Sequence, residues 1–314
     1  MIGILLNGRR KIIIMEITQK KKKKKFQFQA YLWIIPTFAL LMLFCYYPAF
    51  SAFSMSLTDA DGTGKGTFIW FDNFIKLFQD PVFYISLKNV IIFTIVGIIS
   101  GNFMTILLAE LLYNLRSVRS SSVYRFLFII PILVPSVVTT LIWQYIVFSG
   151  GESGIANTIL SLFNLEPIGW YFDVKWAGFS IILTGFPWVA GTSFLIYLAG
   201  LQNISPEIIE ASKLDGASIF QRIFRVDLPL LKGQIKYFLI MGIIGGIQNF
   251  NLQLLITGPG VGTTNNVNVP GYYLFEEAFT FDRYGYASAI GVIIFIITLI
   301  LTIINMRITK KGDQ

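Results

Sequence analysis

Residues 204–229 read ISPEIIEASKLDGASIFQRIFRVDLP and separate two long apolar segments. The residues SPE at 205–207 are typical of a helix start, because a hydroxyl can cap free amide groups, proline fits the first helical position, and an acid complements the helix dipole. Gly216 is expected to end this helix after residue 214, since glycine adopts the left-handed conformation without a Cβ penalty. The first half of the stretch therefore predicts a short capped helix.

A second short helix is predicted directly after the glycine. The residues SIFQ at 218–221 fit the capping-box pattern, in which a serine hydroxyl and a glutamine side chain cap each other's backbone amides. The pair Leu228–Pro229 is expected to close this helix. Two capped helices that meet at a glycine are typical of a docking element, and a passive loop would need neither cap.

The composition indicates a membrane protein. The 314-residue chain is 54% hydrophobic and 13% charged, with a mean hydropathy of +0.67, which excludes an ordinary soluble globule. A helix needs roughly 20 apolar residues to cross the hydrocarbon core, and backbone groups in lipid must pair internally. The alternating segments of a β-barrel are not visible. We predict an all-α integral membrane protein with six transmembrane helices, at about 31–54, 86–112, 126–148, 177–201, 235–257 and 286–307.

The charges indicate the orientation. Twenty of the 25 Lys and Arg residues lie on one side of the predicted spans, and the remaining five lie on the other. The positive-inside rule therefore places both termini and the loop 202–233 in the cytoplasm. We expect a basic cytoplasmic N-terminal segment at 1–29, a transmembrane domain at 30–308 and a cytoplasmic tail at 309–314. The basic balance follows from this topology, and no folded basic module points to nucleic acid.

The N-terminal segment carries six consecutive lysines, Lys20–Lys25, which would lie at the anionic inner leaflet. A signal peptide is not expected, because the apolar run at 2–6 is too short for the hydrophobic region of such a peptide. Met15 is an alternative start, and the sequence leaves the choice between Met1 and Met15 open.

Several chemistries are excluded by what the sequence lacks. There is no histidine, which excludes imidazole catalysis and histidine metal sites. The single cysteine, Cys45, lies in the first span and cannot form an intrachain disulfide. No phosphate-binding loop occurs, and GTGKGT at 62–67 is expected to be a flexible turn on the outer side. We expect no catalytic residue, metal or cofactor on this chain, so ATP hydrolysis would require a separate subunit.

The order Glu210-Ala211-Ser212, Gly216 and Leu228-Pro229 resembles the signature loop of bacterial ABC importer permeases, which carry Glu-Ala-Ala, a Gly and a Leu-Pro ending. Here serine replaces the second alanine. Three further stretches resemble the carbohydrate-importing, maltose-type branch of this family, and more specifically the first of its two permease subunits: AYLWIIPTFALLMLFCYYPAFSAFSMSLTD (30–59), FDNFIKLFQDPVFYISLKN (71–89) and FDRYGYASAIG (281–291).

The resemblance implies a type I ABC importer permease fold in the bacterial cytoplasmic membrane. It also implies that the chain forms half of a translocation pore for a sugar or oligosaccharide. The implied partners are a homologous second permease, ABC ATPase subunits that bind ATP and magnesium, an extracellular solute-binding protein and the lipid bilayer. Alternatives are a permease for another small polar solute, a polytopic membrane enzyme or a secondary transporter, although the last two would need intramembrane acids that are not evident.

The loop 202–233 is the expected contact with the ATPase. We expect the helix at 206–214 to enter a groove of that partner and the second helix mainly to pack against the ends of the spans through Ile219, Phe220, Ile223 and Phe224. Polar contacts are expected from Glu207, Glu210, Lys213 and Asp215, and close backbone approach at Ala211, Gly216 and Ala217.

Polar and aromatic residues inside the spans are the candidates for substrate contact, because intramembrane polar groups usually face a cavity or a partner helix. The candidates are Gln248, Asn249, Phe250 and Asn251 in the fifth span, with Gln253 further along, and Trp188 beside Pro187 in the fourth. Hydrogen bonding to a neighbouring helix and a packing kink at Pro187 remain open as alternatives. The pairs Gly97–Gly101 and Gly242–Gly246 have the spacing of close helix contacts.

Overall fold

The structure is a computed structural model that describes residues 28–311, apart from residues 65, 116, 152, 189–190 and 259–266, and the side chains of residues 32–307 within that range. The lysine run, Met15 and the end of the predicted tail lie outside the described residues. Every regular element in the described part of the chain is a helix, and a single isolated bridge pairs Thr58 with Phe68. The prediction of an all-helical protein is confirmed.

The chain divides into two units, residues 1–51 and residues 52–314. The first contains α2 (Phe28–Leu41), the π-helical turn η1 (Met42–Tyr46) and most of α3 (Tyr47–Met55), which follow one another without a break. Residues Leu32–Met55 form an apolar helix long enough to cross a membrane. This helix agrees with the predicted span at 31–54, and it contains Cys45 as a free thiol.

The second unit is built around one long helix, α5. The connection to it runs through α4 (Asp72–Gln79), and α5 itself spans 33 residues, about 50 Å at 1.5 Å per residue. The remaining helical elements, in chain order, are α5 (Pro81–Tyr113), α6 (Val118–Ile129), η2 (Ile130–Leu133), α7 (Ser136–Ile142), η3 (Trp143–Val147), α8 (Ile155–Ser161), α9 (Ala177–Leu183), α10 (Gly191–Gln202), α11 (Pro206–Leu214), α12 (Ile219–Arg222), η4 (Ile223–Asp227), α13 (Leu228–Leu230), α14 (Lys232–Gln248), α15 (Asn251–Thr257), α16 (Pro270–Phe279) and α17 (Tyr284–Lys311).

Four helical segments in the described residues have the length and apolar character to cross a membrane: Leu32–Met55, Pro81–Tyr113, Lys232–Thr257 and Tyr284–Arg307. A fifth crossing would be the pair Val118–Leu133 and Ser136–Val147, which is bent by 91°. Pro135 lies at this bend, where a missing amide and a restricted preceding residue prevent a straight helix. Four of the six predicted spans are thus long apolar helical segments, of which the fifth comprises α14 and α15, and the third is a bent pair.

The predicted span at 177–201 is not one continuous helix. It consists of α9 and α10, which are separated by a turn that begins at Thr184. Gly185 and Trp188 have positive φ angles of 85° and 55°, outside the helical region, and Pro187 has no amide hydrogen to donate. The kink expected at Pro187 is therefore a complete interruption of the helix.

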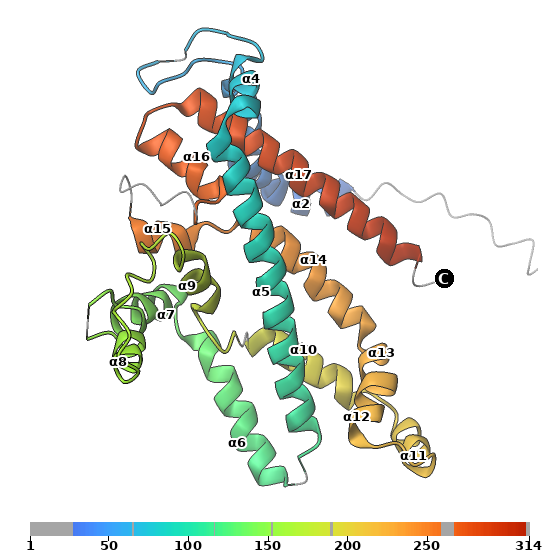
Figure 1. The fold of residues 1–314 in the computed structure, drawn as a ribbon. Helices are drawn as coiled ribbons and strands as arrows, with labels where there is room; N and C mark the ends of the chain where they lie inside the picture. Colours follow the sequence, from blue (N-terminus) through green and yellow to red (C-terminus); the bar gives the residue numbers. More distant parts are fainter. Residues whose placement is uncertain are drawn as a thin grey trace, which may run out of the picture. The chain divides into compact units, whose positions relative to one another are not determined.

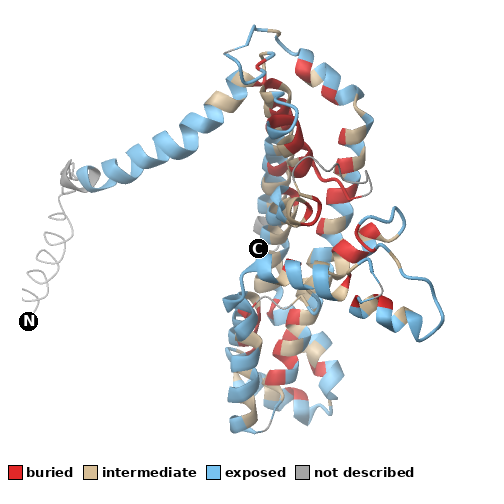
Figure 2. Ribbon diagram, turned by 90° about the vertical axis from the view of Figure 1, so that its left-hand side faces the viewer, coloured by how far each residue is buried: buried red, intermediate tan, exposed pale blue. Residues whose placement is uncertain are grey.

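Helix α5 packs against α10 and α14, and Figure 1 shows α11 and α12 to one side of its lower end and α4 at its upper end. A buried cluster joins Ala109 and Leu112 of α5 to α10, through Phe194, Tyr197, Leu198 and Leu201, and to Leu231. In Figure 2 the buried residues follow the lines where helices of the second unit meet. The ends of α5 and α10 and the residue Leu231, just after the 204–229 loop, are therefore held together by apolar packing.

Glycines set the distance between α5 and α14. A Cβ atom added at Gly242 would lie 2.7 Å from Ile98, and one added at Gly246 would lie 2.5 Å from the Thr94 hydroxyl. The predicted role of Gly242 and Gly246 in close helix contact is confirmed. Gly97 does not share it, because a Cβ there would meet open space.

The opposite surface of α5 is apolar and exposed. Ile91, Ile95, Ile99 and Phe103 follow one another at four-residue spacing, and each is more than half exposed. Residues four apart lie on the same face of a helix, so they form one stripe. A stripe of this kind is expected against lipid or a partner helix.

Candidate functional site

The first predicted helix of the 204–229 loop forms as expected. Helix α11 begins with Pro206 at its first position and ends at Leu214. The sequence predicted that the Ser205 hydroxyl caps a backbone amide, but this bond does not form. The hydroxyl instead donates to the Glu207 carboxylate. This bond lowers the pKa of Glu207 below its usual value, so the start of α11 presents a carboxylate.

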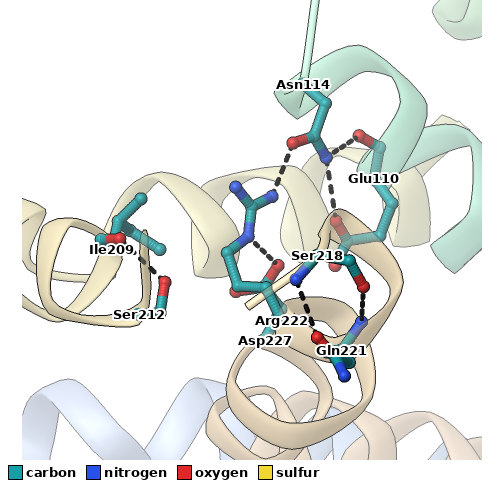
Figure 3. A network of polar contacts seen from close by, with 8 residues as sticks. All are labelled: Glu110, Asn114, Ile209, Ser212, Ser218, Gln221, Arg222 and Asp227. Atoms are coloured by element: carbon teal, nitrogen blue, oxygen red, sulfur yellow. Dashed lines mark hydrogen bonds and ion pairs between the residues drawn. The ribbon is translucent and has the colours of Figure 1, made fainter. Parts of the chain in front are cut away.

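The loop turns at Gly216, which has a φ of 73°. At this turn the Ala217 amide donates to the Ser212 carbonyl at 3.0 Å, and the Gly216 amide donates to the Lys213 carbonyl at 3.0 Å. These bonds satisfy the carbonyls of Ser212 and Lys213 near the end of α11, and the positive φ favours glycine, which has no Cβ. Ser212 itself is buried and donates its hydroxyl to the Ile209 carbonyl at 2.7 Å (Figure 3). The serine that replaces the second alanine of the signature is thus accommodated within the helix.

The second helix begins with the predicted capping box. The Gln221 amide donates to the Ser218 hydroxyl at 3.3 Å, and the Ser218 amide donates to the Gln221 side chain at 2.8 Å (Figure 3). The predicted end of this helix at Leu228–Pro229 is wrong. The π-helical turn η4 continues directly into α13, and a turn follows only at Leu231. Proline is tolerated there because it lies in the first turn of α13, where its missing amide has no helical partner to lose.

The side chains expected to contact an ATPase lie at the surface. Glu207, Glu210, Ala211, Lys213, Asp215 and Gly216 are exposed, and Ala217 is half-buried. Leu214 at the end of α11 is 89% exposed. An exposed leucine between charged residues, on a helix outside the apolar spans, is a feature of an interaction surface.

The expectation that the second helix packs through its apolar residues is wrong. Phe220 is 75% exposed and Phe224 is 67% exposed, and Ile219 is exposed as well, while Ile223 is half-buried. The helix instead faces the body of the protein with a charged residue, Arg222, which is 8% exposed. The apolar side chains of this helix therefore extend the exposed surface of α11.

Arg222 connects the loop to the end of α5 (Figure 3). Its Nε donates to Asp227 Oδ2 at 3.0 Å and its Nη2 donates to Asn114 Oδ1 at 2.5 Å, while the guanidinium lies 5.7 Å from the centre of the Tyr113 ring. Asn114 in turn donates to the Glu110 carbonyl at 2.8 Å and to the Glu110 carboxylate at 3.3 Å. The Arg222 guanidinium thus bonds directly to one acid, Asp227, and to the Asn114 side chain, and Asn114 links it to Glu110.

The charged residues of this polar network are buried from solvent. Asp227 is fully buried and Glu110 is 4% exposed, and one oxygen of each carboxylate, Glu110 Oε1 and Asp227 Oδ1, has no hydrogen-bond partner in the described chain. Sequence reasoning did not single out Glu110, Asn114 or Asp227 as site residues. The available signal was the spacing of Glu110 and Asn114, which places them on one helix face.

A cavity lies in the apolar part of the second unit, between α5, α10 and α14. It has a volume of about 350 Å³, and its lining includes Asn249 and Trp188. An adjoining cavity of about 190 Å³ shares both residues and adds Gln253 and Thr184. Two of the predicted substrate candidates, which lie 61 positions apart in the sequence, therefore meet at one site.

The other predicted candidates lie elsewhere. Gln248 and Asn251 are exposed and line neither cavity, although the Asn251 amide donates to Asn249 Oδ1 at 3.2 Å. Phe250 packs with Val90 and Tyr272, and its ring stacks on Phe275. The fifth span is interrupted at Asn249 and Phe250, between α14 and α15. The side chains from 248 to 253 therefore do not share faces as they would on one continuous helix.

Sequence reasoning missed Thr94. It lines both cavities and is 8% exposed, and its hydroxyl oxygen has no hydrogen-bond partner in the described chain. Trp188 has its ring nitrogen occupied, because Nε1 donates to the Ile182 carbonyl at 2.9 Å. This bond fixes the indole at the turn between α9 and α10. The pair Gly97–Gly101 also lines the larger cavity, so these glycines leave space there and are not helix contacts.

A second polar cluster joins α4, α16 and α17 at the other end of α5. The Asp80 carboxylate accepts hydrogen bonds from Tyr273 and Tyr286, and it lines a cavity of about 430 Å³ with Asp59 and Arg283. On α16, burial is the main cause that raises the pKa of Glu276 above its usual value. The negative charge of Glu277 raises this pKa further, and a hydrogen bond with Tyr272 lowers it in part. No cluster in the described residues is suited to hold a metal ion.

Comparison with known proteins identifies the family to which this chain is similar. Residues 101–311 match the family described as binding-protein-dependent transport system inner membrane component. A probable ABC transporter permease protein of Bacillus subtilis is 31% identical, with 90% of this chain and 97% of the relative covered. The sulfoquinovosyl glycerol transport system permease protein of Agrobacterium fabrum is 32% identical, with 90% and 91% covered.

The fold is also that of a solved transporter. A chain of a bacterial alginate ABC transporter, solved with an alginate pentasaccharide-bound periplasmic protein, has a TM-score of 0.80 at 22% identity, covering 93% of this chain and 98% of that chain. The family match extends over most of the second unit, including the 204–229 loop and the cavity residues Trp188 and Asn249. This chain therefore belongs to the family of binding-protein-dependent transport system inner membrane components.

Proposed function

We propose that this chain is the membrane-spanning permease subunit of an ATP-driven importer for a sugar or oligosaccharide, and that it forms half of the translocation pore. The observation that carries this proposal is the cavity shared by Asn249 and Trp188, which lies in the apolar segment of the second unit. Sugars offer hydroxyl groups to amides and apolar ring faces to aromatic side chains. The names of the family relatives support a sugar as the substrate class.

We propose that the chain crosses the membrane six times. The four long apolar helices and the bent pair Val118–Val147 supply five crossings, and α9 with α10 supplies the sixth as a broken pair. Interrupted helices are tolerated at membrane depth where they line a cavity, and the interruption that begins at Thr184 carries Trp188. The distribution of lysine and arginine places both termini and the 204–229 loop in the cytoplasm.

The 204–229 loop is proposed as the coupling element for the ATPase. Helix α11 presents Glu207, Glu210 and Lys213 at the surface, and the turn at Gly216 allows a partner backbone to approach closely. The exposed side chains Phe220 and Phe224 extend this contact surface onto the second helix. The partner would therefore bind both helices, with polar contacts on one and apolar contacts on the other.

Movement of the loop would reach the pore through Arg222. Its bond to Asn114 ties the second helix to the end of α5, and α5 carries Thr94 in the cavity wall at its middle. The long helix would therefore transmit displacement as one body. ATP and magnesium would remain on the partner ATPase, whose closure would switch the pore between inward-facing and outward-facing states.

The proposed partners are a homologous second permease, two ATPase subunits and an external solute-binding protein. The solved transporter described with a periplasmic protein supports the last of these. The second permease would cover part of the exposed apolar surface, which includes Ile91 and Ile95 on α5.

The proposal is tested by purifying this chain with the products of the neighbouring genes and screening glycans for stimulated ATP hydrolysis. We expect stimulation by at least one sugar together with its binding protein, and loss of this stimulation in Asn249→Ala. Glu210→Lys should prevent co-purification of the ATPase while the two permeases still assemble. A complex that no sugar stimulates, but that another small solute does, would redirect the proposal to a permease for that solute.

A further inference from the structure

The wall of the cavity carries no charge. The two adjoining cavities share Phe93, Thr94, Gly97, Trp188, Gly246 and Asn249, and each further lining residue among the described residues is likewise apolar or neutral. Small rearrangements of side chains would not change this. The three stretches that line the cavities, 89–109, 176–206 and 237–275, contain no Asp, Glu, Lys or Arg at any position.

The absence of charge limits what the cavity can hold. A carboxylate, sulfate or phosphate loses its hydration when it enters an apolar site, and that cost is recovered only by a cation or by several aligned donors. The nearest charged positions along α5 are Lys88 and Glu110, outside the stretch that lines the cavities. An anionic substrate would therefore find no countercharge on this chain.

Neutral groups that suit a sugar are present. The Asn249 oxygen accepts from the Asn251 amide, which leaves the two amide hydrogens of Asn249 for a ligand. The Thr94 hydroxyl lies in the wall, buried and without a partner. Phe93, Trp188 and Phe238 supply aromatic surface. Amide, hydroxyl and aromatic groups together match the hydroxyl groups and ring faces of an uncharged sugar.

We propose that the substrate of this permease is an uncharged saccharide, and that saccharides bearing carboxylate, sulfate or phosphate groups are excluded. This inference rests on the proposed function and makes it more specific. It does not follow from the fold, because the solved transporter with the same fold is involved in the import of an acidic polysaccharide. The discrimination comes from the residue types that line this cavity.

The test measures binding to the purified permease pair without the solute-binding protein, so that only the pore contributes to selectivity. Saturation-transfer NMR is recorded with neutral trisaccharides of glucose, galactose and mannose, each beside the trisaccharide of the matching uronic acid. We expect at least one neutral trisaccharide to bind, and its uronic acid counterpart to bind at least about tenfold more weakly, because the carboxylate has no countercharge.

A gain-of-charge variant provides the complementary test. Asn249→Lys places a cation in the cavity wall and should increase binding of the uronic acid trisaccharide by about tenfold, because a charge-assisted bond becomes available. Gln248→Lys is the matched control, since Gln248 is exposed next to Asn249 but lines neither cavity. The control should leave the binding ratio unchanged.

The two proposals fail in different ways. Equal binding of a neutral trisaccharide and its uronic acid counterpart by the unaltered permease would overturn the inference and leave the importer function intact. The same holds if Gln248→Lys enhances uronic acid binding as strongly as Asn249→Lys. If no saccharide binds and none stimulates ATP hydrolysis by the complete complex, the proposed sugar importer itself is refuted, and this inference with it.

Discussion

Replacing Arg222 by methionine should destabilise the protein strongly, because the arginine is the only cation in the buried network described around Glu110 and Asp227. Its side chain is 9% exposed and that of Asp227 is fully buried, with 3.0 Å between Nε and Oδ2. Asp227 Oδ1 already lacks a partner, so Arg222→Met would leave neither carboxylate oxygen with a described side-chain partner. Removing one member of a buried ion pair costs about 3–5 kcal/mol.

The double variant Arg222→Met, Asp227→Leu should recover most of this loss, since an apolar pair of similar volume replaces a buried ion pair at little cost. The free energy of unfolding is measured by denaturant titration of the purified permease pair in micelles. Arg225→Met is the control, because Arg225 lies in the following turn, is exposed and forms no described ion pair. Its effect should stay within about 0.5 kcal/mol.

Function separates a coupling role from a purely structural one. In the double variant the bond from Arg222 to Asn114 is gone while the exposed surface of α11 is intact. We therefore expect a normal amount of co-purified ATPase but reduced stimulation of ATP hydrolysis by substrate. Two results would refute the reasoning: Arg222→Met no more destabilising than Arg225→Met, or a stable double variant whose ATPase is stimulated normally.

Three further predictions follow from local geometry. Gly246→Val should disrupt the contact between α5 and α14, because its Cβ would lie 2.5 Å from the short, stiff Thr94 side chain. Gly245→Ala is the control, because its Cβ would meet open space, and it should be neutral or stabilising by up to about 1 kcal/mol. Thermal unfolding of the permease pair compares the two variants. Gly216→Val should unfold the turn after α11, whose φ is 73°, and abolish ATPase co-purification, while the same exchange at Gly233, which has no positive φ, should retain it. Burial raises the pKa of Glu276 in the folded protein, so this residue stabilises the folded state below the usual carboxyl pKa, and the contribution is lost as pH rises through the pKa of the folded state. Glu276→Gln should therefore flatten the decline of thermal stability with increasing pH. An unchanged pH profile would contradict the raised pKa.

Much of the 204–229 loop could be predicted because its signals are local. A proline at the first helical position, a glycine with positive φ and a capping box each act within a few residues, and all three are present in the structure. The end of the second helix could not be predicted in this way. Leu228–Pro229 has a local preference to stop a helix, but the chain continues through η4 and α13, where the buried Asp227 is bonded to Arg222.

The candidate site was only partly visible in the sequence. Polarity inside an apolar segment identified Asn249 and Trp188, which meet in the cavity. The same rule also selected Gln248 and Asn251, which do not line it, because the break between α14 and α15 changes which face each side chain occupies. Thr94 was missed because threonine is common in apolar helices, and only its unpaired hydroxyl at the wall distinguishes it.

The sequence by itself determined that this protein is helical and apolar, that the first helix of the loop runs from Pro206 to Leu214, and that the stretches around the cavity carry no charge. These properties depend on composition and on interactions between residues close in the chain. Only the tertiary structure decided that Arg222 bonds to Asn114 and that Thr94, Trp188 and Asn249 share one wall. Residues far apart in sequence meet through the packing of α5 against α10 and α14, and no local preference specifies that packing.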